Sequence, residues 1–170
     1  ASLNLLMLGA DMARVIEGYL ALHPKGNLNT TILSHDPEAI AFAKAILNGQ
    51  GDRVQYLEQN IFSLQLDSSF DLIWGSLHPN ILKEEFRGIL VQLFPLLNTG
   101  GKALFSFLQA HSTISHLLAF VGWELAYPSL SGIHSLCREI LPPGYEATCW
   151  GNIPSSYGLL EIANTQPLIS

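Results

Sequence analysis

The sequence is short of charge. Only 13% of its 170 residues are Asp, Glu, Lys or Arg, against about 25% in an average globular domain. Two interpretations are open. A protein partner, or the rest of a parent multidomain chain, covers part of the surface; or Ser, Asn and Gln take the place of charge on a surface that faces water.

Basic residues, long apolar runs and cysteines are also scarce. The chain has eight Lys and Arg, no basic run and a net charge of −6, whereas nucleic-acid binding needs clustered cations. No apolar run approaches the ~18 residues of a membrane span, and no signal peptide is visible. Cys137 and Cys149 make neither a disulfide framework nor a metal site. We therefore expect a cytoplasmic protein with no nucleic-acid or membrane partner.

What the sequence does contain is enough apolar material for a core. The apolar fraction is 48%, and this length predicts a single domain over residues 1–170. The first expected strand begins almost at Ala1. Either an initiator methionine was removed or the chain is a fragment of something longer, and the sequence leaves both possibilities open.

Strand and helix patterns alternate along the chain. Asp36-Pro37 is typical of a helix start, with Asp36 as the N-cap, and Pro95 is expected either to kink its helix or to end it early. Short apolar strands between helices predict a three-layer, doubly wound and mostly parallel α/β sheet. The expected strands are 5–8, 30–34, 54–57, 71–74 and 102–107, then an antiparallel pair at 145–150 and 158–163; the expected helices are 11–22, 36–47, 84–97 and 112–120, with a turn at 98–101.

Three segments in this order resemble the class I S-adenosylmethionine-dependent methyltransferases. They are Ser34-His35-Asp36-Pro37-Glu38-Ala39-Ile40, Phe70-Asp71-Leu72-Ile73-Trp74-Gly75-Ser76-Leu77-His78, and Leu96-Leu97-Asn98-Thr99-Gly100-Gly101-Lys102-Ala103-Leu104-Phe105. The likeness covers residues 5–107. It implies a seven-stranded sheet whose last strand is antiparallel, with S-adenosylmethionine across the carboxyl ends of the first strands.

Carrying the family's cofactor residues onto this chain gives a poor match. Met7 stands where the family has an acid late in the first strand, and the glycine-rich turn keeps only Gly9. Ser34 falls at the acid that holds the ribose hydroxyls, and Asn60 at the acid that meets the adenine amino group. The cofactor contacts implied by the resemblance are Gly9, Ala10, Asp11, Ser34, His35, Asn60, Ile61 and Gly75.

The loss of carboxylates matters because a charged acceptor makes a stronger hydrogen bond than a hydroxyl. Each replacement costs ~1–3 kcal/mol. Several together weaken binding by a few powers of ten. The same residues also have local structural interpretations. Asp36 is more typical of a helix cap than of a ribose ligand, Asn60 can cap a turn, and Asp71 looks structural.

His78 is the candidate for chemistry. It follows the fourth strand, where the methyl acceptor lies in the family, and a neutral imidazole suits a general base. It can equally be a loop histidine before a proline. The five-residue separation of His111 and His116 is poor for a metal site, and neither a Gly-x-Ser-x-Gly elbow nor a P-loop is present.

Two functions are consistent with these patterns. The first is a degenerate, non-catalytic methyltransferase-fold domain with a structural or interaction role. The second is an active S-adenosylmethionine-dependent methyltransferase that acts on a small-molecule acceptor with His78 as base. The apolar stretch 123–143 covers the substrate side or forms a contact surface, and the sequence does not decide which.

Overall fold

The computed structural model describes residues 2–77, 83–109, 113–122, 129–151 and 157–167. In chain order the elements are β1 (Leu3–Leu8), α1 (Ala13–Leu22), β2 (Leu28–Ser34), α2 (Pro37–Ile46), η1 (Gly51–Arg53), β3 (Val54–Glu58), η2 (Ile61–Ser63), β4 (Phe70–Leu77), α3 (Lys83–Leu93), η3 (Phe94–Leu96), β5 (Leu97–Leu108), α4 (Thr113–Phe120), α5 (Leu130–Ile140), β6 (Tyr145–Trp150) and β7 (Tyr157–Asn164).

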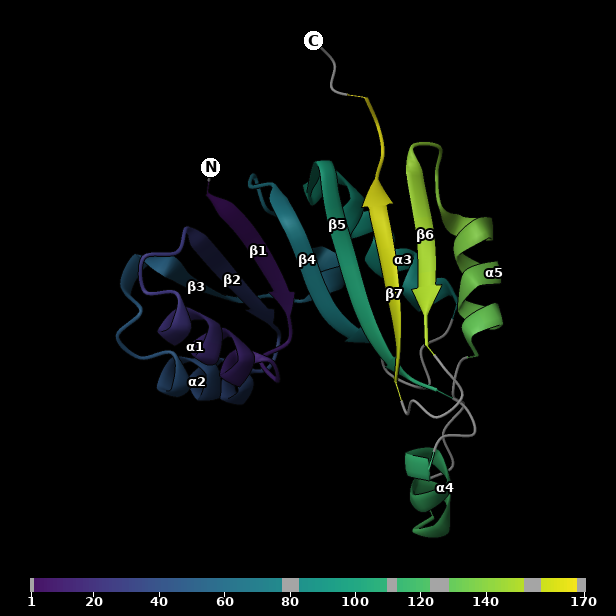
Figure 1. Ribbon diagram of the computed structural model, residues 1–170, viewed down its shortest axis with the longest axis horizontal. Helices are drawn as coiled ribbons and strands as arrows, with labels where there is room; N and C mark the ends of the chain where they lie inside the picture. The colour runs from purple at the N-terminus through teal and green to yellow at the C-terminus, as the bar shows by residue number, and fades with distance from the viewer. Residues whose placement is uncertain (1, 78–82, 110–112, 123–128, 152–156, 168–170) are drawn as a thin grey trace.

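These strands form one seven-stranded sheet in the order β3-β2-β1-β4-β5-β7-β6. The first five strands of this order run parallel, while β7 is antiparallel to both of its neighbours. The parallel strands point the same way, so their carboxyl ends meet at one edge, the lower one in Figure 1. The predicted three-layer α/β class and the antiparallel last strand are confirmed.

Two apolar clusters hold the layers together. On one face, α1 and α2 pack against β1–β3, and the cluster includes Met7, Ile16, Ile32 and Ile40. On the other face, α3 and α5 pack against β4–β7 around a second cluster that includes Phe86 and Phe105. The rings of Phe86 and Phe105 meet edge to face at 5.8 Å, an arrangement that aromatic pairs favour.

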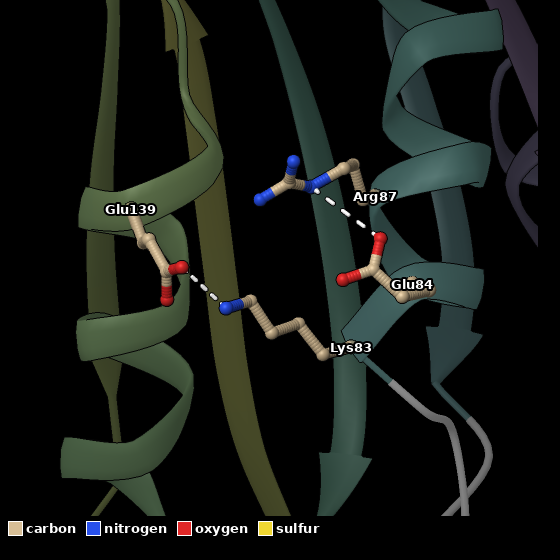
Figure 2. Close-up of polar contacts among 4 residues, drawn as sticks. All are labelled: Lys83, Glu84, Arg87 and Glu139. Atoms are coloured by element: carbon tan, nitrogen blue, oxygen red, sulfur yellow. Dashed lines mark hydrogen bonds and ion pairs between the residues drawn. The ribbon is translucent and has the colours of Figure 1, made fainter.

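A polar contact on the surface links α3 to α5. The ammonium of Lys83, the first residue of α3, bonds the carboxylate of Glu139 on α5, and Glu84 lies 3.9 Å from Arg87 within α3 (Figure 2). The Lys83 ammonium also lowers the pKa of Glu139 from its ordinary value. Such exposed pairs add little free energy, so the apolar cluster beneath them carries the packing of the two helices.

The face of β5, β7 and β6 opposite α3 and α5 is not covered by a helix in the described residues (Figure 1). Leu104 and Leu159 are half-buried there, and Trp150 is 45% exposed. Lys102 and Glu161 form an ion pair of 3.1 Å on neighbouring strands of the same face. Among the described residues, this part of the sheet face is therefore open.

The boundaries of several elements differ from the predictions. The first helix begins at Ala13 rather than at residue 11, and the predicted helix 84–97 is wrong beyond Leu93. Proline has no N–H to continue an α-helix, so Pro95 falls in η3 and β5 follows at once. The apolar stretch 123–143 contains α5, which the sequence analysis did not assign.

A bulge in β5 takes the place of the turn predicted at 98–101. Phe70 on β4 pairs with Leu97, but Leu72 already pairs with Lys102, so the intervening residues leave the ladder. Glycine is required here, since a Cβ on Gly101 would lie 2.8 Å from the carbonyl oxygen of Asn98. The Asp71 carboxylate holds this bulge: it accepts from the Asn98 amide and from the Asn4 backbone N–H, both at 2.8 Å.

Replacing Asp71 by alanine is predicted to destabilise the fold. Removing the half-buried carboxylate leaves a backbone N–H of β1 and the Asn98 amide without their acceptor, at a cost of about 1–3 kcal/mol in the free energy of unfolding. Asp67→Ala is the matched control, because Asp67 is exposed in the β3–β4 connection, and we expect a change within about 0.5 kcal/mol. Urea unfolding measures both; equal effects of the two variants would contradict the structural role of Asp71.

Candidate functional site

A pocket of about 330 Å³ lies at the carboxyl ends of β1, β2 and β4, bordered by α3 and by the segment after β3. This is the usual ligand position in open parallel sheets. None of the described residues that line it is Asp, Glu, Lys or Arg. The lining residues are Leu8, Gly9, Leu33, Ser34, His35, Gln59, Ile61, Ser76, Leu77, Ile89 and Phe105.

Gly9 forms the turn between β1 and α1. Its φ of 96° lies in the left-handed region, which L-residues with a Cβ rarely occupy. Its N–H donates to the carbonyl of Leu33 at 2.8 Å and so ties the ends of β1 and β2 together. Ala10 is buried in the cluster beneath α1 and does not line the pocket, whereas the Asp11 side chain is exposed.

Ser34 and Asp36 cap the backbone where β2 leads into α2. The Ser34 hydroxyl accepts from the Asp36 N–H at 3.1 Å, and the Asp36 carboxylate accepts from the Glu38 N–H at 2.9 Å. Asp36 is thus the predicted N-cap of α2. Ser34 and the exposed His35 both line the pocket, but one lone pair of the Ser34 oxygen is already used within its own turn.

Asn60 is engaged in the same local way after β3. Its side-chain oxygen accepts from the Phe62 N–H at 2.9 Å and caps η2. Asn60 is exposed and lies outside the pocket lining, while its neighbours Gln59 and Ile61 line it. The Gln59 backbone N–H donates to the Ser34 carbonyl at 3.1 Å, which joins the ends of β2 and β3.

At the end of β4, Gly75 has a packing role. It is buried beside Leu8 on β1, and a Cβ at Gly75 would lie 3.1 Å from the Leu8 side chain. The next residue, Ser76, lines the pocket. Its hydroxyl lies 2.9 Å from that of Ser106 on β5 and 3.5 Å from the Asp11 carboxylate.

The predicted cofactor residues therefore separate into two groups. Gly9, Ser34, His35 and Ile61 meet around the pocket, whereas Ala10, Asp11, Asn60 and Gly75 do not line it. His78 lies outside the described residues. Sequence reasoning missed the apolar lining residues Leu8, Leu33, Leu77, Ile89 and Phe105, whose convergence depends on strand register and on the packing of α3.

Other chemistry has little support in the part of the chain that the structure describes. No group of three or more His, Cys, Asp and Glu there could hold a metal. Both cysteines are free, and burial, with a smaller effect from Cys149, raises the pKa of the Cys137 thiol to about 12. Such a thiol stays protonated and is a poor nucleophile. No helix among the described residues could cross a bilayer.

Neither a protein-family model nor a protein of curated function matches the sequence. Solved structures do. The apo form of the S-adenosylmethionine-dependent methyltransferase SibL aligns with a TM-score of 0.72 at 18% identity, over 97% of this chain and 51% of that one. The N-methyltransferase NodS from Bradyrhizobium japonicum WM9, in complex with S-adenosyl-L-homocysteine, aligns with a TM-score of 0.66 at 17% identity, over 98% of this chain and 80% of that one.

A third example is the plantazolicin methyltransferase BpumL in complex with S-adenosylhomocysteine, with a TM-score of 0.73 and 14% identity over 96% of this chain and 76% of that one. The chain therefore has the fold of the class I S-adenosylmethionine-dependent methyltransferases, as the three sequence segments predicted. It spans about half the length of SibL.

Gly9→Ala is predicted to destabilise the protein. A Cβ at this positive φ is strained, and it would lie 3.1 Å from the Asp11 carboxylate; we expect a loss of about 1–2 kcal/mol in the free energy of unfolding. Gly18→Ala is the control, because Gly18 lies on the exposed side of α1 with open space around it. There alanine should stabilise by ~0.5–1 kcal/mol. Urea unfolding that gives the two variants the same sign would contradict the strain at Gly9.

Proposed function

We propose that this chain is a methyltransferase-fold domain that does not catalyse methyl transfer and that has a structural or interaction role. The observation that carries the proposal is that no Asp, Glu, Lys or Arg stands in the described lining of the pocket at the edge where the fold holds its cofactor. S-adenosylmethionine brings a sulfonium, an ammonium, a carboxylate and a ribose diol to that position. Buried charges of this kind need paired or hydrogen-bonding partners.

The donor set does not fit this cofactor. Met7, at the position of the family's first acid, is fully buried in the core and faces away from the pocket. Ser34 offers a hydroxyl that already accepts from its own turn, and Asn60 caps η2 outside the lining. Asp11 is exposed and turns toward Gly9 and Ser76. The carboxylates that would hold the diol and the adenine amino group have thus been replaced by side chains that stabilise local backbone.

Three features support an interaction role. The open face of β5, β7 and β6 exposes Trp150. Helix α4, which stands clear of both helix layers in Figure 1, exposes Leu117 and Phe120 by 60% and 89%. Apolar surface of this kind is typical of a contact with another protein or with another part of a longer chain, and the low charge content of the sequence agrees with it.

An active methyltransferase is the second candidate function. It is favoured by the backbone of the first loop, since Gly9 keeps a positive φ and the pocket beside it is open. In that case S-adenosylmethionine would be the cofactor, His78 the general base and a small molecule the acceptor.

Calorimetric titration with S-adenosylhomocysteine distinguishes the two. For the native chain we expect no heat of binding at about 1 mM ligand, because several charged hydrogen bonds are missing. Ser34→Asp restores one carboxylate at the end of β2 and should strengthen binding by ~5–100-fold, enough to be measured. Ser68→Asp is the control: it adds the same charge at an exposed serine outside this pocket, and it should leave binding undetectable.

Micromolar binding by the native chain would contradict the non-catalytic proposal and favour the second candidate. Loss of methyl transfer in His78→Ala would then be the result that assigns the base. Equal effects of Ser34→Asp and Ser68→Asp would show that net charge alone, rather than a ligand at the end of β2, governs affinity.

A further inference from the structure

The pocket at the carboxyl edge is large enough for a small molecule and has no Asp, Glu, Lys or Arg in its described lining. At about 330 Å³ it falls at the lower end of the roughly 300–1,000 Å³ of small-molecule sites. Its walls are mainly apolar side chains from four strands, η2 and α3, including Leu33, Ile61 and Phe105. A cavity of this kind favours an apolar body with few polar groups.

The polar side chains in the lining are the hydroxyls of Ser34 and Ser76, the amide of Gln59 and the exposed imidazole of His35. Ser34 already accepts from the Asp36 N–H, and Ser76 contacts the Ser106 hydroxyl, but each hydroxyl can form a further hydrogen bond to a ligand. The Gln59 side chain adds an amide to the lining. A hydroxyl or amide can orient a neutral ligand, but it compensates a desolvated carboxylate or sulfonate less well than a charged donor does.

A carboxylate beside this edge disfavours anions further. Asp11 lies next to Gly9 and 3.5 Å from the Ser76 hydroxyl, which itself borders the pocket. No Lys or Arg among the described lining residues offsets it. Like charges at short range repel even at the protein surface.

On the basis of the proposed loss of the charged cofactor, we propose that this pocket binds a neutral aromatic small molecule and excludes its anionic counterparts. The apolar walls take the ring system, and Ser34, Gln59 or Ser76 bonds a single polar edge. The selectivity of this site would differ from that of the fold's usual cofactor position, because no Asp, Glu, Lys or Arg stands in the described lining and Asp11 lies beside it.

A matched pair of fluorescent ligands tests this selectivity. N-phenyl-1-naphthylamine is neutral, and 8-anilino-1-naphthalenesulfonate has the same aromatic body with a sulfonate added. We expect saturable fluorescence enhancement with the neutral compound and at least ~10-fold weaker binding of the sulfonate. Equal affinities, or no saturable binding of the neutral compound, would overturn the proposal.

Pocket-filling variants locate the binding. Ile61→Trp and Ser34→Trp add bulk from two different elements that line the pocket, and each should weaken the neutral ligand by about tenfold or more. Either one suffices if its unfolding transition shows that it folds. Val91→Trp is the control, since Val91 is 57% exposed on α3 and does not line the pocket. Loss of binding in Phe120→Ser instead would place the dye on α4 and overturn the proposal.

Competition with S-adenosylhomocysteine distinguishes a failure of this inference from a failure of the proposed function. Unchanged fluorescence in the presence of excess S-adenosylhomocysteine supports both. Displacement of the neutral dye by S-adenosylhomocysteine would contradict the non-catalytic proposal and the exclusion of charge together. Equal binding of the two dyes without displacement by S-adenosylhomocysteine would overturn only the selectivity inferred here.

Discussion

The Asp71 carboxylate joins three strands at the centre of the sheet. It lies on β4, accepts from the backbone of β1 and holds the bulge with which β5 begins. A half-buried carboxylate needs such donors, because removing it from water without hydrogen-bonding partners is unfavourable. With these bonds in place, β1 and β4 align so that Leu8 meets Gly75. The same register between β1 and β4 also sets the positions of the carboxyl ends of these strands, which border the pocket.

At that edge, two side chains that the family resemblance places near the cofactor form hydrogen bonds within their own turns. Ser34 and Asn60 both accept backbone N–H groups two residues ahead of them. These bonds satisfy groups at the ends of β2 and β3 that would otherwise face the pocket or solvent. The proposed loss of catalysis and the proposed preference for neutral ligands rest on the same feature. Where the family resemblance implies carboxylates, this chain has Ser34 and Asn60, which cap local backbone.

Much of the architecture could be predicted from the sequence, because the signals were local. Alternating apolar strands and helices predicted the sheet, and Asp36-Pro37 predicted the start of α2, which the bond from Glu38 confirms. Non-local features were not accessible. The convergence of Leu77, Ile89 and Phe105 depends on the pairing of β4 with β5 and on where α3 packs. The early end of α3 was hard to predict because the apolar pattern continues to residue 97, although Pro95 interrupts the helix before it.

The most direct test of the account is a titration of isotope-labelled protein with S-adenosylhomocysteine, followed by the backbone amide NMR signals of Gly9, Ser34 and Gln59. These residues surround the pocket on three strand ends. The account predicts that their signals stay in place at millimolar ligand while the rest of the spectrum also remains unchanged. Saturable shifts confined to these amides would show that the cofactor position still binds its ligand, and would contradict the account.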